Sequence, residues 1–381
     1  MEQIFEALYT GAGMLWKALW ALAFGYTISA GIQVLVSREQ MGRVLGARGL
    51  KQAGLAGFFG FVSSSCSFAA LAASRSVLVK GAHPANALAF LIASTNLVIE
   101  LGIVLWVLVG WRFTLGNILL GILMLAYAYG ITRLWFPRRL AEQARAHAEH
   151  AQQREGMEME HGMQGSFRDK LLSLAGWTRI AHAFFMEWKM VWKEILFGFT
   201  VAGFISVFVP QAFWDAIFIG GEGEPSFFAV LENALVAPVV AFFTFIGSMG
   251  NVPLAAMLWA KGNSFGGVMA FLGADLLAAT VVWIHVKYYG WRYALYLSAV
   301  LYICMVAAGV TVHYLFALFG ALPVTRPAVT EMIRFSIDHT FFLNLAFGTL
   351  AAVLLWLHMR GPAQRHEHSR EVHRHAGGRH H

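Results

Sequence analysis

The stretch LVKGAHPANALAFLIAS at residues 78–94 returns, with substitutions, as WAKGNSFGGVMAFLGAD at residues 259–275. When residue 78 is set on residue 259, a Lys-Gly pair falls on a Lys-Gly pair and Ala-Phe-Leu falls on Ala-Phe-Leu. The same register sets Ser67 on Ser248 and Ser94 on Asp275. Self-similarity at a fixed offset indicates a repeated structural unit. The sequence therefore predicts two halves derived from one ancestral unit.

Composition decides the environment of these halves. Of the 381 residues, 58% are hydrophobic and 13% are charged, with a mean hydropathy of +0.60. Soluble domains carry about 25% charged residues, and disordered chains carry more charge and less apolar surface. Several uncharged stretches reach the length of about 20 residues that a membrane-spanning helix requires. These values exclude an ordinary soluble enzyme and predict an all-α polytopic membrane protein.

The excess of positive charge does not predict a nucleic-acid partner. The net charge is +7, but the basic residues lie in short loops and tails beside apolar segments, where they set membrane orientation. Cys66 and Cys304 both lie in apolar segments, so no disulfide framework is expected. Glu2 and Glu6 stand where a signal peptide would carry basic residues. We therefore expect the first apolar segment to remain in the protein as a span.

Charge and hydropathy divide the chain into five parts. We expect a first transmembrane repeat at 1–136, a basic cytoplasmic linker at 137–189 and a second repeat at 190–325. An additional transmembrane helix follows at 326–360, and a His-rich tail occupies 361–381. The predicted fold is two repeated halves with broken or re-entrant helices and an extra C-terminal span.

Two arrangements of the halves are open. If every apolar segment crosses the membrane, each half has four spans and the halves are parallel. The basic loop around Arg43 and Lys51 then lies opposite the basic linker, against the positive-inside tendency. If residues 52–80 and 233–261 are re-entrant, each half has three crossings and the halves are inverted. The distribution of Lys and Arg favours the inverted arrangement.

Two segments interrupt the apolar runs, SSSCS at residues 63–67 and GSMGNVP at residues 247–253. Transporters place substrate sites at helix breaks near the bilayer midplane. A cysteine thiol is a soft ligand for Cu(I), Zn or trivalent arsenic, although free cysteine also packs as a small apolar residue. We expect substrate contacts from the residues of these two segments, namely Cys66, Ser65, Ser67, Ser248 and Asn251.

Two carboxyl groups fall inside apolar segments. A carboxylate in a span costs about 2.5–3.5 kcal/mol on insertion scales, so such residues commonly line a pathway or a proton relay. Asp275 and Glu100 are therefore predicted to couple protons or to line the pathway. Asn96 lies one helical turn before Glu100 and is predicted to contact substrate. The alternative for Glu100 is an interfacial position or a structural pair with Arg75 or Lys80.

The C-terminal tail is rich in histidine, a composition that binds metals. His366, His368, His373 and His375 are weak candidates for metal ligands, and the alternative is a solvated spacer. The chain lacks a GxxxxGK[ST] loop, which excludes an ATP-driven pump encoded in this chain, and it lacks HExxH and GxSxG motifs. We expect no cofactor and no enzymatic activity.

Residues 66–96 and 247–277 resemble the bacterial predicted-permease family that includes the ArsP-type organoarsenical efflux permeases, and the resemblance extends over about residues 15–289. Family members typically carry Cys-Ser-Cys-Gly in the first repeat and Cys-Ser-Ile-Gly-Asn-Val-Pro-Leu-Ala in the second. Here Cys66 and Ser67 are kept, whereas Phe68 stands at the second cysteine and Gly247 at the cysteine of the second repeat. Ser248 and residues 250–255 match. These segments carry fewer cysteines than the family pattern, so they depart from an arsenic site built from several thiolates.

The resemblance implies an inner-membrane permease that exports a small toxic solute, such as a trivalent organoarsenical or a heavy-metal species, by alternating access. Its partners would be the small-molecule or metalloid substrate and the lipid bilayer. One alternative is a non-transporting metal sensor or scaffold built on the His and Met tracts. Another is an intramembrane enzyme with a Cys66 or serine nucleophile, but no histidine lies near either interrupted segment to act as its base. The sequence does not predict an oligomeric state.

Overall fold

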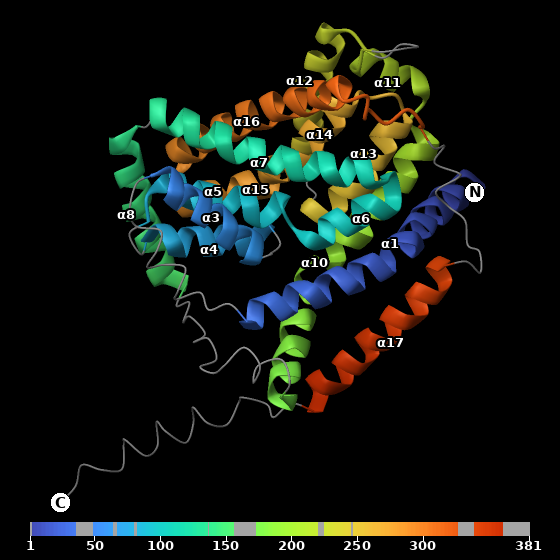
Figure 1. Cartoon of the computed structure of the whole chain (residues 1–381), viewed down its shortest axis with the longest axis horizontal. Coiled ribbons are helices and arrows are strands. Elements are labelled where there is room, and N and C mark those ends of the chain that lie inside the picture. Colours follow the sequence, from blue (N-terminus) through green and yellow to red (C-terminus); the bar gives the residue numbers. More distant parts are fainter. Residues whose placement is uncertain are drawn as a thin grey trace, which may run out of the picture.

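The computed structural model describes residues 2–35, 49–63, 67–79, 82–135, 137–155, 173–219, 225–244, 247–326 and 339–360. All regular secondary structure in these ranges is helical (Figure 1). The first half comprises α1 (Glu2–Leu35), α3 (Leu50–Ser63), α4 (Ser67–Val79), α5 (Pro84–Asn96), α6 (Ile99–Val109) and α7 (Trp111–Leu134).

The second half follows the same order of helices. It comprises α10 (Leu174–Phe208), α11 (Gln211–Ile217), α12 (Phe227–Thr244), α13 (Ser248–Ala260), α14 (Phe265–Gly273), the 3-10 helix η1 (Ala274–Leu277), α15 (Ala279–Tyr289) and α16 (Trp291–Leu318). Helix α8 (Arg138–Glu155) lies between the halves in sequence, and α17 (His339–Arg360) follows them. Of the two interrupted segments, residues 248–253 form the first turns of α13, directly after Gly247. Residues 64–66, between α3 and α4, lie outside the described residues.

Matching helices of the two halves begin and end at matching residues. Ser67 begins α4 and Ser248 begins α13, which is the register of the sequence repeat. Helices α6 and α15 both stop at a glycine with a positive φ, 99° at Gly110 and 82° at Gly290. Each of these glycines is followed by a Trp-Arg pair that opens the next helix. The repeat is therefore present in the structure as well as in the sequence.

Side chains fix the starts of the two corresponding helices α5 and α14. The imidazole of His83 accepts a hydrogen bond from the backbone N–H of Ala85, and Pro84 occupies the first helical position. In the second half the Ser264 hydroxyl accepts from the N–H of Gly267. A capping acceptor satisfies one of the N–H groups that a helix start leaves unpaired. Different residues thus perform the same local task in the two halves.

Helices α1 and α10, the first of each half, pack against each other in opposite directions. Near the start of α1, a methyl group at Gly203 would lie 2.2 Å from the carbonyl oxygen of Ala7. Near the end of α1, the Ser29 hydroxyl donates to Glu187 at 3.0 Å. Residue numbers rise along α1 as they fall along α10, so the two helices are antiparallel.

The last helices of the halves, α7 and α16, are also antiparallel. The hydroxyl groups of Tyr127 and Thr311 are hydrogen-bonded at 2.9 Å. Further along α7, the carbonyl oxygen of Trp135 accepts from the Tyr296 hydroxyl at 2.8 Å. The halves also cross, because α4 packs on α15 and α13 packs on α6. In the first of these contacts the guanidinium of Arg75 lies 3.9 Å from the centre of the Tyr288 ring.

Two helices outside the repeat brace it. Helix α8 packs on α4, α15 and α16 through the buried Ala141, Ala144 and Ala148, and Arg145 donates to the carbonyl oxygen of Ala82 at 2.7 Å. Helix α17 lies along α1 and α10 (Figure 1), where Asn344 donates to the carbonyl oxygen of Trp16 at 2.9 Å. The helix predicted beyond the second repeat is thus present.

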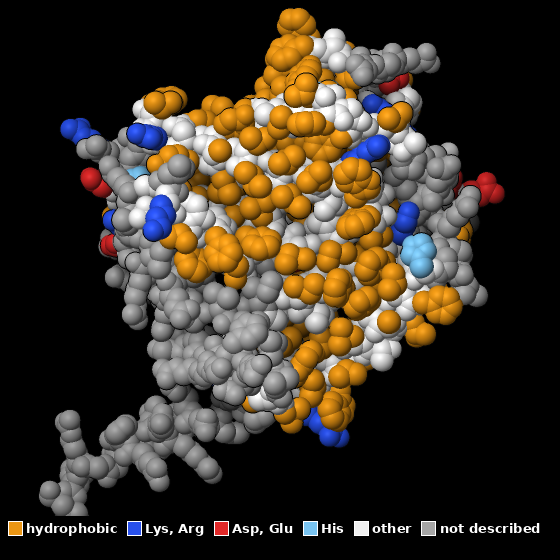
Figure 2. All heavy atoms as spheres, in the orientation of Figure 1, with side chains coloured by type: hydrophobic (Ala, Val, Ile, Leu, Met, Phe, Trp, Pro, Cys, Tyr) orange, Lys and Arg blue, Asp and Glu red, His pale blue; other side chains and the backbone are white. Residues whose placement is uncertain are grey.

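Within the described residues, six helical segments are long and apolar enough to cross a membrane, or seven if the pair Phe265–Leu277 and Ala279–Tyr289, bent by 40°, is one span. The six are Pro84–Val109, Trp111–Leu134, Val191–Phe208, Phe227–Thr244, Trp291–Leu318 and His339–Arg360. Large apolar side chains are exposed on these helices, including Ile122, Phe243 and Leu345. Figure 2 shows orange apolar atoms over much of the visible face. The prediction of an all-α polytopic membrane protein is confirmed.

Candidate functional site

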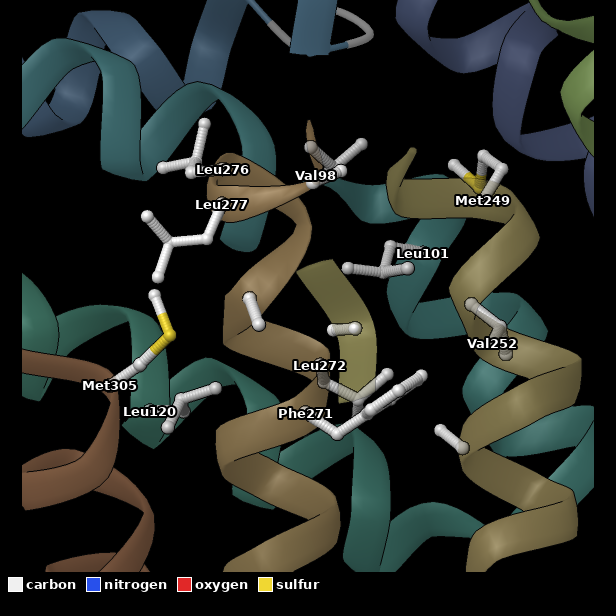
Figure 3. Packing of buried hydrophobic residues seen from close by; sticks show 14 of the residues in the cluster. Val98, Leu101, Leu120, Met249, Val252, Phe271, Leu272, Leu276, Leu277 and Met305 are labelled. Carbon is white, nitrogen blue, oxygen red and sulfur yellow. The ribbon is translucent and has the colours of Figure 1, made fainter. Parts of the chain in front are cut away.

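The helix breaks of both halves share one core. Val98, in the break between α5 and α6, belongs to the same buried cluster as Leu276 and Leu277 of η1 and Met249 of α13 (Figure 3). Helix α13 also packs directly on α6 and on η1. Residues at the break between α5 and α6, in η1 and at the start of α13 therefore belong to one buried core, where irregular backbone is surrounded by other helices, as membrane depth requires.

Ser248 and Asp275 form the central polar contact of the second half. Ser248 is the first residue of α13, and Asp275 lies in η1 with none of its surface exposed. The Ser248 hydroxyl donates a hydrogen bond to Oδ2 of Asp275. A hydrogen bond donated to a carboxylate stabilises its ionised form. Two residues that the sequence selects for different reasons, 27 positions apart, are thus brought into contact.

A second carboxyl group lies at the same place. A methyl group at Gly247 would lie only 2.6 Å from Oε2 of Glu194, which projects from α10. Asp275 is near enough to act electrostatically on Glu194. Sequence reasoning missed Glu194 because this residue directly follows Trp192 and Lys193, near the start of the predicted second repeat. An acidic residue at the very start of an apolar run was the available signal.

Asn251 lies three residues after Ser248 on α13, so the two side chains are on one side of the helix. Asn251 has no exposed surface, and within the described residues neither its Nδ2 nor its Oδ1 has a hydrogen-bond partner. Buried carboxamides are normally hydrogen-bonded, because an unpaired polar group costs about 1–3 kcal/mol. Asn251 therefore offers both a donor and an acceptor to a molecule that enters this region.

The backbone of α10 touches that of α13 beside this cluster. A methyl group at Gly198 would lie 2.5 Å from Cα of Gly250 and 2.6 Å from its carbonyl oxygen. Glycine at residue 198 thus permits a helix contact that any side chain would prevent. Because of this contact, Glu194, one turn earlier on α10, reaches the start of α13.

In the first half, Asn96 is bonded within its own repeat. Its Nδ2 donates to the hydroxyl of Thr95 at 3.1 Å and to the carbonyl oxygen of Ile92 at 3.3 Å. Asn117 on α7 donates to the carbonyl oxygen of Asn96 at 2.8 Å, at the end of α5. Sequence reasoning missed Asn117, which holds the break of the first half. Oδ1 of Asn96 is buried and has no partner within the described residues.

Glu100 is buried at the start of α6, with 2% of its surface exposed. It lies against α1, since a methyl group at Gly25 would be 2.2 Å from Cβ of Glu100. The described structure thus places Glu100 at the contact between α1 and α6, and it places Ser248, Asp275 and Glu194 together at the start of α13.

Several predicted site residues lie outside the described residues: Cys66, Ser65, His366, His368, His373 and His375. Ser67 begins α4, but its side chain is also outside the description. Cys304 is buried in α16. In the described part of the chain, no group of three or more His, Cys, Asp and Glu side chains is arranged to hold a metal ion.

Comparison with known proteins relates the chain to permeases. Residues 3–314 match the family ArsP_1, described as "Predicted permease". The chain is 42% identical over 301 residues to a Mycobacterium tuberculosis protein named "Putative permease Rv2963", and the match covers 78% of this chain and 73% of that protein. No solved structure matches the chain.

Proposed function

Because this chain belongs to the ArsP_1 family of predicted permeases, we propose that it exports a small toxic solute, such as a trivalent organoarsenical or a heavy-metal species, across the inner membrane. The observation that carries this proposal is the contact between Ser248 and Asp275, beside Glu194, inside a multi-pass membrane protein. Ionisable groups at membrane depth commonly mark a substrate or ion pathway.

Alternating access between two inverted halves is the proposed mechanism. In an inverted repeat, corresponding helices of the two halves run in opposite directions. The antiparallel pairs α1 with α10 and α7 with α16 agree with this relation. The crossed contacts, α4 on α15 and α13 on α6, are those that would change if one half rocked against the other.

The chemical groups at the site restrict which solutes it can bind. The described side chains offer oxygen and amide groups from Ser248, Asn251, Asp275 and Asn96, which suit protons and hydrogen-bonding solutes better than soft metals. A thiophilic cargo would need the thiol of Cys66. In this proposal the thiol of Cys66 binds the soft atom, whereas the hydroxyls of Ser65 and Ser67, the α13 residues and Asn96 bind polar parts of the solute.

The test is uptake by everted membrane vesicles that contain the full chain. Trivalent methylarsenic, Zn²⁺ and Cu(I) are supplied separately, with and without a proton gradient, to vesicles with wild type, Cys66→Ala or Asp275→Asn. We expect gradient-dependent uptake of one of the three, lost in both variants. Uptake of none of the three would refute the arsenical and metal cargo. Uptake that survives both substitutions would refute the proposed site.

A further inference from the structure

We propose that Glu194 and Asp275 share one proton, that Glu194 holds it in the conformation described here, and that its release couples transport to a proton gradient. The inference rests on the proposed transport function and deepens it. It assigns a role in coupling to Glu194, which the sequence repeat does not indicate, in addition to Asp275.

The position of Glu194 is set by backbone contacts. The glycine contact between residues 198 and 250 brings α10 against α13. The absence of a side chain at residue 247 leaves room for the Glu194 carboxyl, since a methyl group there would lie 2.6 Å from Oε2 and 3.3 Å from Oε1. The neighbouring residue Ser248 holds Asp275. Residues 247 and 248 thus each contact one of the two carboxyl groups.

The two carboxyl groups differ in their hydrogen bonding. Ser248 donates to Asp275, and a donated hydrogen bond favours the carboxylate form. Glu194 is mostly buried next to that negative charge. Two carboxylates that share a buried site cannot easily both be ionised, and one of them keeps its proton. Glu194, which lies against Gly247, is the group that keeps the proton.

The charged groups on elements packed against α10 do not change this assignment. Helix α13 carries none, and α1 carries Lys17 beyond its first two turns. Helix α17 has His339, His358 and Arg360 at its two ends. On α10 itself, Lys189 and Lys193 flank Glu194, and Glu187 accepts from Ser29 of α1. A proton held between Glu194 and Asp275 limits the net charge buried at the start of α13.

A movement of α13 and η1 relative to α10, within the second half, would separate the two carboxyls. Asp275 would stay bonded to Ser248 and move with α13, whereas Glu194 would stay with α10. Once apart from Asp275 and open to water, Glu194 would ionise and release its proton to that side. The return of α13 would then require a proton from the solution, which ties one cycle of this movement to one proton.

The test is infrared spectroscopy of the full-length protein in lipid vesicles, titrated with pH, because it reports protonated carboxyl groups without any cargo. Glu194→Gln and Asp275→Asn are the test variants. Glu187→Gln is the matched control, because Glu187 is a buried glutamate on the same helix that accepts a hydrogen bond from Ser29. Gly247→Ala adds a variant that keeps both carboxyls and displaces only the Glu194 side chain.

We expect a protonated carboxyl band at neutral pH that is absent in Glu194→Gln and unchanged in Glu187→Gln. In Asp275→Asn and in Gly247→Ala, a smaller share of Glu194 should be protonated at the same pH, because the neighbouring negative charge is removed or more distant. A band that survives Glu194→Gln, or that titrates as in wild type in both Asp275→Asn and Gly247→Ala, would overturn the shared proton. These outcomes do not depend on which cargo the vesicle assay finds.

Discussion

The break between α5 and α6 and the break between α14 and α15 occupy corresponding places in the two halves, but their chemistry differs. At the first break, Asn117 of α7 bonds the carbonyl oxygen of Asn96, and Asn96 bonds Thr95. At the second break, the residue aligned with Ser94 is Asp275, which bonds Ser248 of α13. The first break is held by neutral groups of its own half, whereas the second carries charge.

This difference shows how one repeated architecture can serve two purposes. Neutral hydrogen bonds within one half keep a bent backbone satisfied at little electrostatic cost. A buried carboxyl is expensive by itself, so its presence favours a functional role. We therefore regard the first break as the structural member of the pair and the second as the proton-carrying member.

The largest expected effect on transport comes from removing the charge that distinguishes the two breaks. Asp275→Asn keeps the size of the side chain but abolishes its charge. Gradient-dependent uptake should fall at least about tenfold, which corresponds to about 1.4 kcal/mol. The aligned change in the first half, Ser94→Ala, should leave uptake close to wild type, since within the described residues the Ser94 hydroxyl donates only to the carbonyl oxygen of Leu91 in its own helix. Equal losses in the two variants would contradict the assignment of roles to the breaks.

The largest expected effect on the stability of the protein comes from filling the glycine contacts that position the two breaks. Alanine at Gly25 would place Cβ 2.2 Å from Cβ and 2.6 Å from Cα of Glu100, and alanine at Gly198 would meet the backbone of Gly250. Both changes should destabilise the protein at the upper end of about 1–3 kcal/mol, measured by thermal unfolding in detergent. Gly54→Ala is the control, because nothing lies within 4 Å of its Cβ position. A stable Gly25→Ala protein would show that α1 does not fix the start of α6.

Much of this comparison could be predicted from the sequence, because it depends on spacing. The offset between residues 78 and 259 predicted two corresponding halves, and the uncharged runs predicted an all-α polytopic membrane protein. The sequence indicated Ser248 and Asp275 as members of one site, but it did not predict that the two side chains contact each other. Glu194 and Asn117 were missed because their partners come from other helices. No local pattern indicates that Gly247 leaves space for a carboxyl, or that α7 passes the end of α5.

A third prediction concerns what the two breaks have in common. Gly110 and Gly290 end α6 and α15 with φ of 99° and 82° and ψ of 167° and 154°, a region that is almost restricted to glycine. Alanine at either position should cost about 2 kcal/mol in unfolding free energy, and the two costs should be similar. A large difference between the two halves, measured by thermal unfolding, would show that the turns after the breaks are not equivalent.

The smallest expected effect isolates the neutral bonding of the first break. Asn117→Ala removes the donor to the carbonyl oxygen of Asn96 and should cost about 1 kcal/mol of stability. Ser298 on α16 is the matched control, because its buried hydroxyl has no hydrogen-bond partner within the described residues. Ser298→Ala should therefore leave the unfolding temperature nearly unchanged. If the first break is structural, the Asn117→Ala protein that remains folded should transport with the same gradient dependence as wild type. A loss of coupling without a loss of stability would instead place the first break in the proton pathway, and the contrast between the two halves would fail.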